Sequence, residues 1–355
     1  MYEAVGRHWH YNNRVITSCE DAMTVQITII GLGQIGSSIG LALKARNVNV
    51  HLMGHDKDPQ VEKEAQRVGA VDEIKHNLPA SVRDAKLVIL ALPFGGMRET
   101  LEVIAPDLQE GVLVLETAPA KATVAGWAKE LLPEGRFYIG LTPAINPEYL
   151  HGTEFGIKAA RADLFERTLM AIHAPQGTPG NVFELATEFV TLLGSLPLFM
   201  DTAEADGIFA ALHTLPQLAA AALLDATVDK PGWNDARKLA GRPFAAVTAG
   251  IAYHDDVTSL RESAIENREN VVRLLNAYIS SLINLRDKID ANDRDAVAAR
   301  LEDSLQGRTR WFDERVAGEW LKGEAQQIDA PSFGDRVNQM LFGAAITDRQ
   351  RQRKQ

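Results

Sequence analysis

Short, almost entirely apolar runs alternate with amphipathic stretches through the first part of the chain. The runs are VQITIIGL from Val25, VNVHLMG from Val48, KLVILALP from Lys86, GVLVLET from Gly111 and RFYIGLTP from Arg136. The stretches between them have helical periodicity, and strands separated in this way by helices predict a parallel, doubly wound sheet. Because each run is apolar at nearly every position, we expect helices to cover both faces of that sheet.

A glycine-rich turn follows the first of these strands. It reads Gly31-Leu32-Gly33-Gln34-Ile35-Gly36 and leads directly into SSIGLALKA, which has helical periodicity. Gly31 allows a tight turn, Gly33 lets the backbone approach a pyrophosphate, and Gly36 lets the helix pack close to the strand. The turn predicts a dinucleotide site at the carboxyl ends of the strands, where Leu92, Pro93 and Glu116 also lie. A glycine turn without a ligand is the alternative.

Asp56 follows the second strand, 20 residues after Gly36. A carboxylate at this place accepts hydrogen bonds from both ribose hydroxyls and repels a 2′-phosphate. We therefore predict NAD as the cofactor. His55 and Lys57 flank Asp56 and soften the preference, so NADP stays open as an alternative.

The sequence pattern changes from strand-like runs to long helical stretches after SLPLFMDTAEAD, which begins at Ser195 and holds the last strand-like run. Helical patterns then cover 206–228, 256–289, 292–306 and 335–342. We predict an α/β protein with a Rossmann-type doubly wound parallel sheet followed by an all-α dimerisation and substrate domain. The predicted segments are an N-terminal extension (1–24), the nucleotide-binding domain (25–203), the helical domain (204–345) and a basic tail (346–355).

Composition narrows the class of protein. The 355 residues carry a net charge of −10, which argues against nucleic acid as a partner. No uninterrupted apolar run reaches the length of a membrane span, and the first 23 residues lack the apolar core of a signal peptide. One cysteine, Cys19, cannot form an internal disulfide. We expect a cytoplasmic protein with no membrane partner, and the histidines show no metal-ligand spacing.

A polar stripe runs along the helix predicted from Asp206. At 100° per residue, Asp206, His213 and Gln217 fall within about 40° of one another, and Pro216 is expected to blur these angles by kinking the helix. The other residues of this helix are mainly Ala and Leu. Helices of this kind have more apolar surface than one small bundle needs, so we predict a homodimer built by the helical half.

Several of these segments together resemble the prephenate/arogenate dehydrogenase family in their order and spacing. They are ITIIGLGQIGSSIGLALK, GHDKDP, LVILALP, ETAPAK with LLPEGRFYIGLTP, DGIFAALHTLPQLAAAAL and IENRENVVRLL, between about residues 25 and 305. The resemblance implies NAD(P) on a Rossmann domain, dimerisation through the helical domain, and oxidation of a ring hydroxyl with loss of carbon dioxide. It also implies that the helix of His213 faces the nicotinamide.

This chain departs from the family at chemically important positions. Thr142 stands where the family has a histidine that bonds the reacting hydroxyl, and Pro119 stands in the place of a serine. Ala245 and Ala249 replace two arginines that meet a substrate carboxylate. A threonine hydroxyl cannot act as a base near neutral pH, and an alanine cannot bind a carboxylate. We therefore expect turnover of prephenate itself to be weak unless other residues compensate.

The remaining polar residues supply candidates for that compensation. We place Thr142, Lys121 and His213 around the reacting group, with His213 as the substitute base or hydrogen-bond donor. Arg242, Gln217 and Asp206 are the candidate substrate contacts. The alternatives are a solvated helix-start lysine at Lys121, a solvated or satisfied helix histidine at His213, and a solvent-facing loop residue at Arg242. The leading hypothesis is a prephenate dehydrogenase-like oxidoreductase that acts on a small molecule. The alternatives are a dehydrogenase of the same fold with another small hydroxy or amino acid substrate, and a non-catalytic nucleotide sensor.

Overall fold

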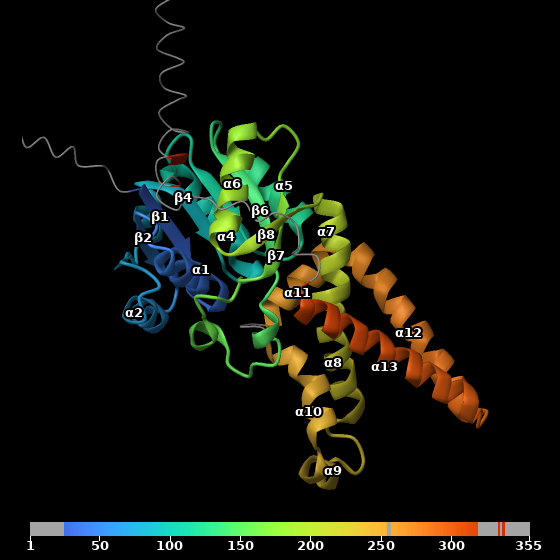
Figure 1. The fold of residues 1–355 in the computed structure, drawn as a ribbon. Helices are drawn as coiled ribbons and strands as arrows, with labels where there is room; N and C mark the ends of the chain where they lie inside the picture. Colours follow the sequence, from blue (N-terminus) through green and yellow to red (C-terminus); the bar gives the residue numbers. More distant parts are fainter. Residues whose placement is uncertain (1–24, 254–256, 319–332, 334–335, 338–355) are drawn as a thin grey trace, which may run out of the picture.

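The computed structural model describes residues 25–253, 257–318, 333 and 336–337. Eight strands form one sheet in the order β3-β2-β1-β4-β5-β6-β7-β8 (Figure 1). Their bounds are β1 Val25–Ile30, β2 Val50–His55, β3 Glu73–Ile74, β4 Ala85–Leu90, β5 Leu113–Glu116, β6 Phe137–Pro143, β7 Thr168–His173 and β8 Ser195–Phe199. All neighbouring strands are parallel except β6 and β7. This arrangement confirms the predicted doubly wound α/β sheet.

Six helices cover the two faces of this sheet. They are α1 Gln34–Ala45, α2 Pro59–Arg67, α3 Leu78–Val82, α4 Met97–Ile104, α5 Lys121–Leu131 and α6 Gly180–Leu192. Ile29 and Ile89 point into a core layer shared with α1, α2 and α6. Ile30 and Leu90, one position further along the same strands, point into a second layer with α3, α4 and α5. Successive strand residues face opposite sides of a sheet, so a strand buried on both sides is apolar throughout.

The antiparallel strand β7 was not among the predicted strands. Between β6 and β7 the chain forms only two short 3₁₀ turns, Pro147–Tyr149 and Gly156–Ala159. A parallel pair needs a crossover that is usually a helix, so this connection returns the chain in the opposite direction instead. The two-residue strand β3 was also missed, because its length leaves no visible pattern.

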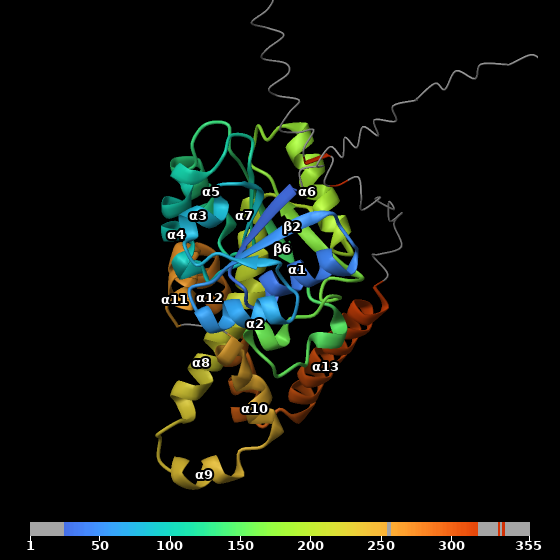
Figure 2. The same ribbon diagram turned by 90° about the vertical axis from the view of Figure 1, so that its left-hand side faces the viewer.

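The second half of the described chain is helical. Its helices are α7 Thr202–Phe209, α8 Leu215–Thr227, α9 Trp233–Leu239, α10 Arg242–Thr248, α11 Val257–Glu266, α12 Arg268–Asp290 and α13 Arg294–Ala317. Further 3₁₀ turns lie at Phe94–Gly96, Ala105–Asp107 and Ala249–Tyr253. Figures 1 and 2 show that α8 to α10 form one projecting arm and that α12 with α13 forms another.

Several sequence predictions about this half of the chain and about the two ends need correction or lie outside the described residues. The predicted helix 256–289 is divided at Asn267, and the predicted helix 292–306 continues to Ala317. The extension 1–24, the basic tail 346–355 and most of the predicted helix 335–342 lie outside the described residues. The predicted domain boundary at 203/204 falls in the first turn of α7 and stays a prediction.

The predicted helix 206–228 contains a π-helical turn at Ala210–Thr214, between α7 and α8. Pro216 has no N–H, so the carbonyl of residue 212 loses its usual partner four residues later. A π turn, in which the bonds span five residues, is one way for a helix to accommodate such a defect. The wider turn changes the phase of the helix between Asp206 and Gln217.

The combined helical segment Thr202–Thr227 is long and apolar enough to cross a membrane by length and composition alone. The segment has 26 residues, and its most apolar stretch of 18 residues has a mean hydropathy of 1.5. In that stretch 22% is buried. Helices that pack against protein pass the same test, so the finding is weak grounds for a membrane span. It does identify a large apolar surface on this part of the chain.

A buried ion pair lies between the sheet and α5. The Lys121 side chain is 0% exposed, and its Nζ donates to Glu116 Oε1 at 2.9 Å and to the Leu141 carbonyl at 2.6 Å. Tyr138 also donates to Glu116 Oε1, at 2.9 Å. Burial lowers the pKa of Lys121, and the charge of Glu116 opposes that shift. Burial likewise raises the pKa of Tyr138 well above its usual value.

Glu116→Gln should lower the free energy of unfolding by about 3–5 kcal/mol, because it leaves the Lys121 ammonium buried without its counter-charge. Adding Lys121→Met should recover much of the loss, since the uncompensated charge is then removed. Glu64→Gln breaks the exposed ion pair with Arg67 and serves as the control, with an unchanged unfolding midpoint. Urea denaturation measures all three variants. Equal effects of Glu116→Gln and Glu64→Gln would contradict the assignment.

Candidate active site

The glycine turn has the tight geometry that its sequence predicts. Gly31 has a φ of 90°, and its N–H donates to the His55 carbonyl at 2.9 Å. A Cβ on Gly31 would lie 2.3 Å from the Ala91 carbonyl oxygen, and one on Gly36 would lie 1.9 Å from the Gly31 carbonyl oxygen. At Gly33 an added Cβ would meet nothing within 4 Å. Gly31 and Gly36 therefore serve packing, whereas Gly33 borders open space.

The first turn of α1 opens onto that space. Gly33 occupies the N-cap position and supplies no side-chain hydrogen bond to the helix. Gly33, Gln34 and Ile35 line a cavity, as predicted for cofactor-binding residues. The N–H groups of a first helical turn have no partner within the helix and favour an anion. This end of the cavity fits a pyrophosphate.

Asp56 anchors the same turn from the end of β2. Its Oδ2 accepts the Leu32 N–H at 2.8 Å, and its Oδ1 accepts the Asp58 N–H at 2.9 Å. A carboxylate offers about four lone-pair sites, so two hydrogen bonds leave capacity for two more. The carboxylate is thus fixed in direction and still able to accept ribose hydroxyls.

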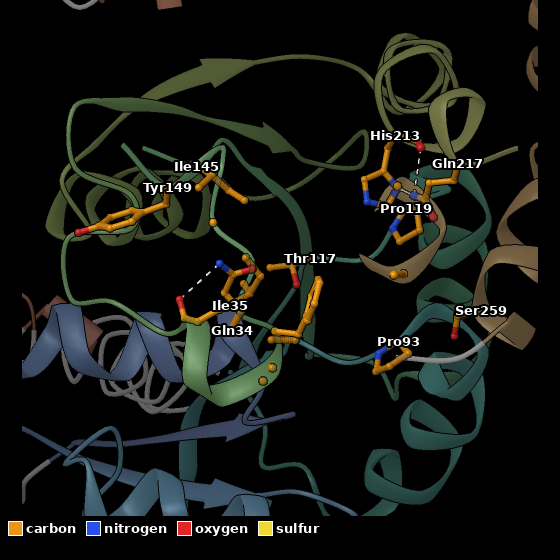
Figure 3. A pocket seen from close by; sticks show the side chains of 18 of the residues that line it. Gln34, Ile35, Pro93, Thr117, Pro119, Ile145, Tyr149, His213, Gln217 and Ser259 are labelled. Atoms are coloured by element: carbon orange, nitrogen blue, oxygen red, sulfur yellow. Dashed lines mark hydrogen bonds between the residues drawn. The ribbon is translucent and has the colours of Figure 1, made fainter. Parts of the chain in front are cut away.

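The cavity at the strand ends has a volume of about 570 Å³. Leu92 and Pro93 after β4, and Thr117 and Pro119 after β5, line one side, while the helical residues His213 and Gln217 line the other. Figure 3 shows Gln34 and Ile35 at one end and His213 with Gln217 near Pro119 at the other. In an open sheet this is the crevice in which a nucleotide binds. The structure thus brings the predicted cofactor residues Leu92 and Pro93 to the same cavity as Gln34.

Gln217 holds the ring of His213. The Gln217 amide nitrogen donates to the His213 carbonyl at 3.0 Å and lies 3.1 Å from His213 Nδ1. Because an amide nitrogen only donates, Nδ1 of a neutral ring accepts and Nε2 carries the hydrogen. Gln217 Oε1 is buried without a protein hydrogen-bond partner in the described structure. A buried amide oxygen at a cavity wall is suited to accept a hydrogen bond from a ligand.

A second cavity, of about 430 Å³, adjoins the first through two shared residues, Leu212 and His213. Its walls are largely apolar, and Thr142, His173, His213 and Arg315 are its polar residues. Arg315 is half-buried on α13, and it donates to the Ile145 carbonyl at 2.6 Å. Burial lowers the pKa of Arg315, but a guanidinium stays protonated near neutral pH. The cavity therefore fits an apolar ring that carries a carboxylate.

Thr142 lies in this second cavity and contacts a histidine that sequence analysis did not single out. Thr142 Oγ1 is 2.9 Å from His173 Nε2. The two residues come from neighbouring strands, β6 and β7. The missed strand β7 explains the missed histidine, because without that pairing nothing in the sequence brings His173 close to Thr142.

Lys121, Glu116 and Asp206 were predicted to contact the substrate or the cofactor, and the structure places them behind the cavity walls. Lys121 and Glu116 are engaged with each other and are fully buried. Asp206 accepts the N–H groups of Lys121 at 2.5 Å and of Ala122 at 3.1 Å, which caps the start of α5. Burial raises the pKa of Asp206. These three residues support the site and line neither cavity.

Arg242 also lies outside both cavities. It is exposed at the start of α10, on the projecting arm. The predicted substrate contact to Arg242 is therefore not formed within this chain. Arg315 is the cation that sequence analysis missed, since it lies about 70 residues further along in a helix with a strongly polar sequence. Among the described residues, no group of three or more His, Cys, Asp or Glu side chains is arranged to hold a metal ion.

Comparisons with known proteins agree with this geometry. The family model described as prephenate dehydrogenase, nucleotide-binding domain, matches residues 39–196. A cyclohexadienyl dehydrogenase from Zymomonas mobilis is 26% identical over 292 residues, which cover 81% of this chain and 96% of that protein. The prephenate dehydrogenase of Bacillus subtilis is 22% identical over 269 residues, 75% of this chain and 71% of that protein.

Solved structures share the fold. The prephenate dehydrogenase of Aquifex aeolicus in complex with hydroxyphenyl propionate and NAD+ superposes with a TM-score of 0.70 at 22% identity, covering 82% of this chain and 99% of that one. The arogenate dehydrogenase of Synechocystis gives a TM-score of 0.61 at 22% identity, covering 81% and 100%. The nucleotide-binding half of this chain thus matches the prephenate dehydrogenase model, and the similarity to the Zymomonas enzyme extends along almost the whole of that protein, so the chain is similar in both its halves to nicotinamide-dependent dehydrogenases of this kind.

Proposed function

We propose that this protein is an NAD-dependent dehydrogenase of a cyclohexadienyl carboxylic acid such as prephenate or arogenate. The observation that carries the proposal is the pair of adjoining cavities. One has the glycine turn at its end, and the other combines an apolar wall with Thr142 and Arg315. They meet at His213, so a substrate in the second cavity would have its reacting end beside the strand ends.

The chain's own residues divide the work of the reaction. When bound, the nicotinamide ring supplies the carbon that receives a hydride from the substrate. The Gln34 and Ile35 amides would hold the pyrophosphate, and the Asp56 carboxylate would accept hydrogen bonds from the ribose hydroxyls. His213, oriented by Gln217, presents a hydrogen-bond donor at the junction of the cavities. Ile208 and Phe209 give the second cavity an apolar wall against which a ring can pack.

Arg315 supplies the cation that the substitutions Ala245 and Ala249 remove from the family pattern. A guanidinium binds a carboxylate through charge-assisted and often bidentate hydrogen bonds. Arg315 and Thr142 line the same largely apolar cavity. A substrate in it would place its carboxylate at Arg315 and its reacting hydroxyl at Thr142. The cavity has a volume of about 430 Å³, so it favours a ring acid over a small hydroxy acid, which would fill little of that space.

The two alternatives remain distinguishable. A dehydrogenase with another hydroxy or amino acid substrate would use the same cofactor site without using Arg315. A nucleotide sensor would bind the cofactor and turn over nothing. The similarity to curated dehydrogenases supports an enzyme, and the polar groups of the second cavity support the ring acid.

We further propose a cytoplasmic homodimer that forms through the helical arms. Val272, Ile279 and Ile283 on α12 are 54%, 49% and 43% exposed. At 100° per residue they lie within about 40° of one another, so they form one apolar stripe. Leu212 on the cavity helix is 76% exposed. Exposed apolar surface of this extent is typical of protein interfaces.

Asp56→Ala should weaken NAD binding roughly 10- to 100-fold, because hydrogen bonds to a charged acceptor are lost. The wild type should bind NAD more tightly than NADP, and the variant should lose that preference. Asp58→Asn, which keeps the N-cap acceptor of α2, is the matched control and should bind NAD like the wild type. Titration calorimetry with both nucleotides measures the effect. Equal affinity of the wild type for NAD and NADP would contradict the role of Asp56.

The wild type should reduce NAD+ in the presence of prephenate or arogenate. Arg315→Met should raise the KM for that acid by roughly 10- to 100-fold, since a charge-assisted contact to the carboxylate is removed. Arg242→Met changes an exposed arginine outside both cavities and should leave the KM unchanged. Absorbance of the reduced nicotinamide reports the rate. Turnover of neither acid, or equal effects of the two arginine variants, would overturn the proposal.

Light scattering should return the mass of a dimer at micromolar concentration. Ile279→Glu should shift the equilibrium to the monomer, because it places a charge in the apolar stripe. Asn284→Glu introduces the same charge on the opposite side of α12, about 140° away, and should leave the dimer intact. A monomeric wild type would refute the dimer.

A further inference from the structure

His173 is a buried histidine to which the proposed function has given no role. It is 1% exposed, ends β7 and borders the second cavity. Thr142 Oγ1 lies 2.9 Å from Nε2 and the Met200 carbonyl lies 3.2 Å from Nδ1, and the backbone and the carboxylate of Asp201 also face the ring. A buried imidazole with both nitrogens engaged is held in one orientation.

The pairing of β6 with β7 places the two side chains together. In the antiparallel register Thr142 lies opposite Ala171, and His173 lies opposite Gly140. Residues two apart on a strand share a face, so Thr142 and His173 form a diagonal pair on one side of the sheet. A Cβ on Gly140 would lie 2.8 Å from Glu116 Oε1, so this glycine makes room for the buried ion pair next to the two side chains.

The hydrogen bonds fix which atom donates. A carbonyl only accepts, so Nδ1 carries the hydrogen that goes to Met200. Burial, reinforced by the charge of Lys121, lowers the pKa of His173 to about 4, so the ring is neutral near pH 7. Nε2 of the neutral ring then has a lone pair and no hydrogen. In the bond between the two side chains, Thr142 must therefore be the donor.

We propose that His173 is a positioning residue that commits the Thr142 hydroxyl to accept a hydrogen bond from the hydroxyl group of the substrate. A free threonine hydroxyl both donates and accepts, whereas one whose hydrogen is already bound to His173 has only lone pairs left for the cavity. The inference rests on the proposed function for the identity of the substrate. It adds a selection rule: a ligand must bring a hydrogen-bond donor to Thr142.

The rule has a chemical consequence for the reaction. The ring hydroxyl of the proposed substrate can donate a hydrogen bond, and so can the phenol hydroxyl that remains after loss of carbon dioxide, whereas a ketone or ether oxygen cannot. An acceptor at Thr142 therefore selects ligands with a free hydroxyl over ligands without one. The other titratable groups of the second cavity, His213 and Arg315, are donors as the structure arranges them, so Thr142 is the acceptor side chain among its polar residues.

Binding of two probes tests the rule without turnover. The probes are 3-(4-hydroxyphenyl)propionate and its 4-methoxy counterpart, which lacks the donor, each titrated by calorimetry into the protein saturated with NAD+. The wild type should prefer the hydroxyl probe by roughly three- to tenfold. Thr142→Val and His173→Phe should each abolish the preference. His173→Gln, whose side-chain oxygen can accept from Thr142, should retain it, and His51→Gln on β2 is the control.

A second measurement reads the orientation directly. In protein labelled with ¹⁵N-histidine and bound to NAD+, the His173 signals, assigned by their absence in His173→Gln, should show a protonated Nδ1 and a bare Nε2 at pH 7. Thr142→Val should shift the Nε2 signal. A protonated Nε2, or an equal affinity of the wild type for both probes, would overturn the inference. Failure to oxidise prephenate and arogenate would refute only the proposed function, because neither of these readouts requires turnover.

Discussion

The carboxylate of Asp206 joins the two halves of the molecule. It sits in α7 of the helical half and caps the first turn of α5, a helix of the nucleotide domain, through the N–H groups of Lys121 and Ala122. Asn267 at the start of α12 donates to the Asp206 carbonyl at 2.7 Å, so a third helix meets the same residue. The placement of His213, about two helical turns further along, depends on this junction. A residue predicted to touch the substrate thus acts by holding the wall in place.

Local physical rules made the nucleotide half predictable. A glycine turn needs particular backbone angles, and a strand buried on both faces needs apolar residues, so both leave direct marks in the sequence. The positions of Gln34, Leu92 and Pro93 followed from those marks. Pairings between distant segments leave no such mark. The contact of Thr142 with His173, and the approach of Arg315 to the same cavity, depend on β7 and α13, whose places only the folded chain reveals.

The departures from the family pattern illustrate how a site can keep its chemistry while its residues change. The imidazole absent at position 142 lies behind the threonine that replaced it, and the cation absent at 245 and 249 is present at 315. Both replacements come from other elements of the fold. A comparison of motifs alone counts positions 142, 245 and 249 as lost functional residues. The cavity brings these groups into one space, which is the basis on which the proposed function assigns their roles.

The π turn at Ala210–Thr214 has a bearing on how this protein is compared with its relatives. A π turn holds one residue more than the α-helical turn it replaces, so it acts as a single-residue insertion without lengthening the helix by a loop. When a relative has an unbroken α-helix here, an alignment without gaps can match residues on only one side of this turn. On the other side, each residue is paired with a neighbour of its true counterpart. Correspondences drawn from Asp206 to Gln217 along this helix therefore require a structural superposition, because a gap-free alignment would pair cavity residues with those on the neighbouring face.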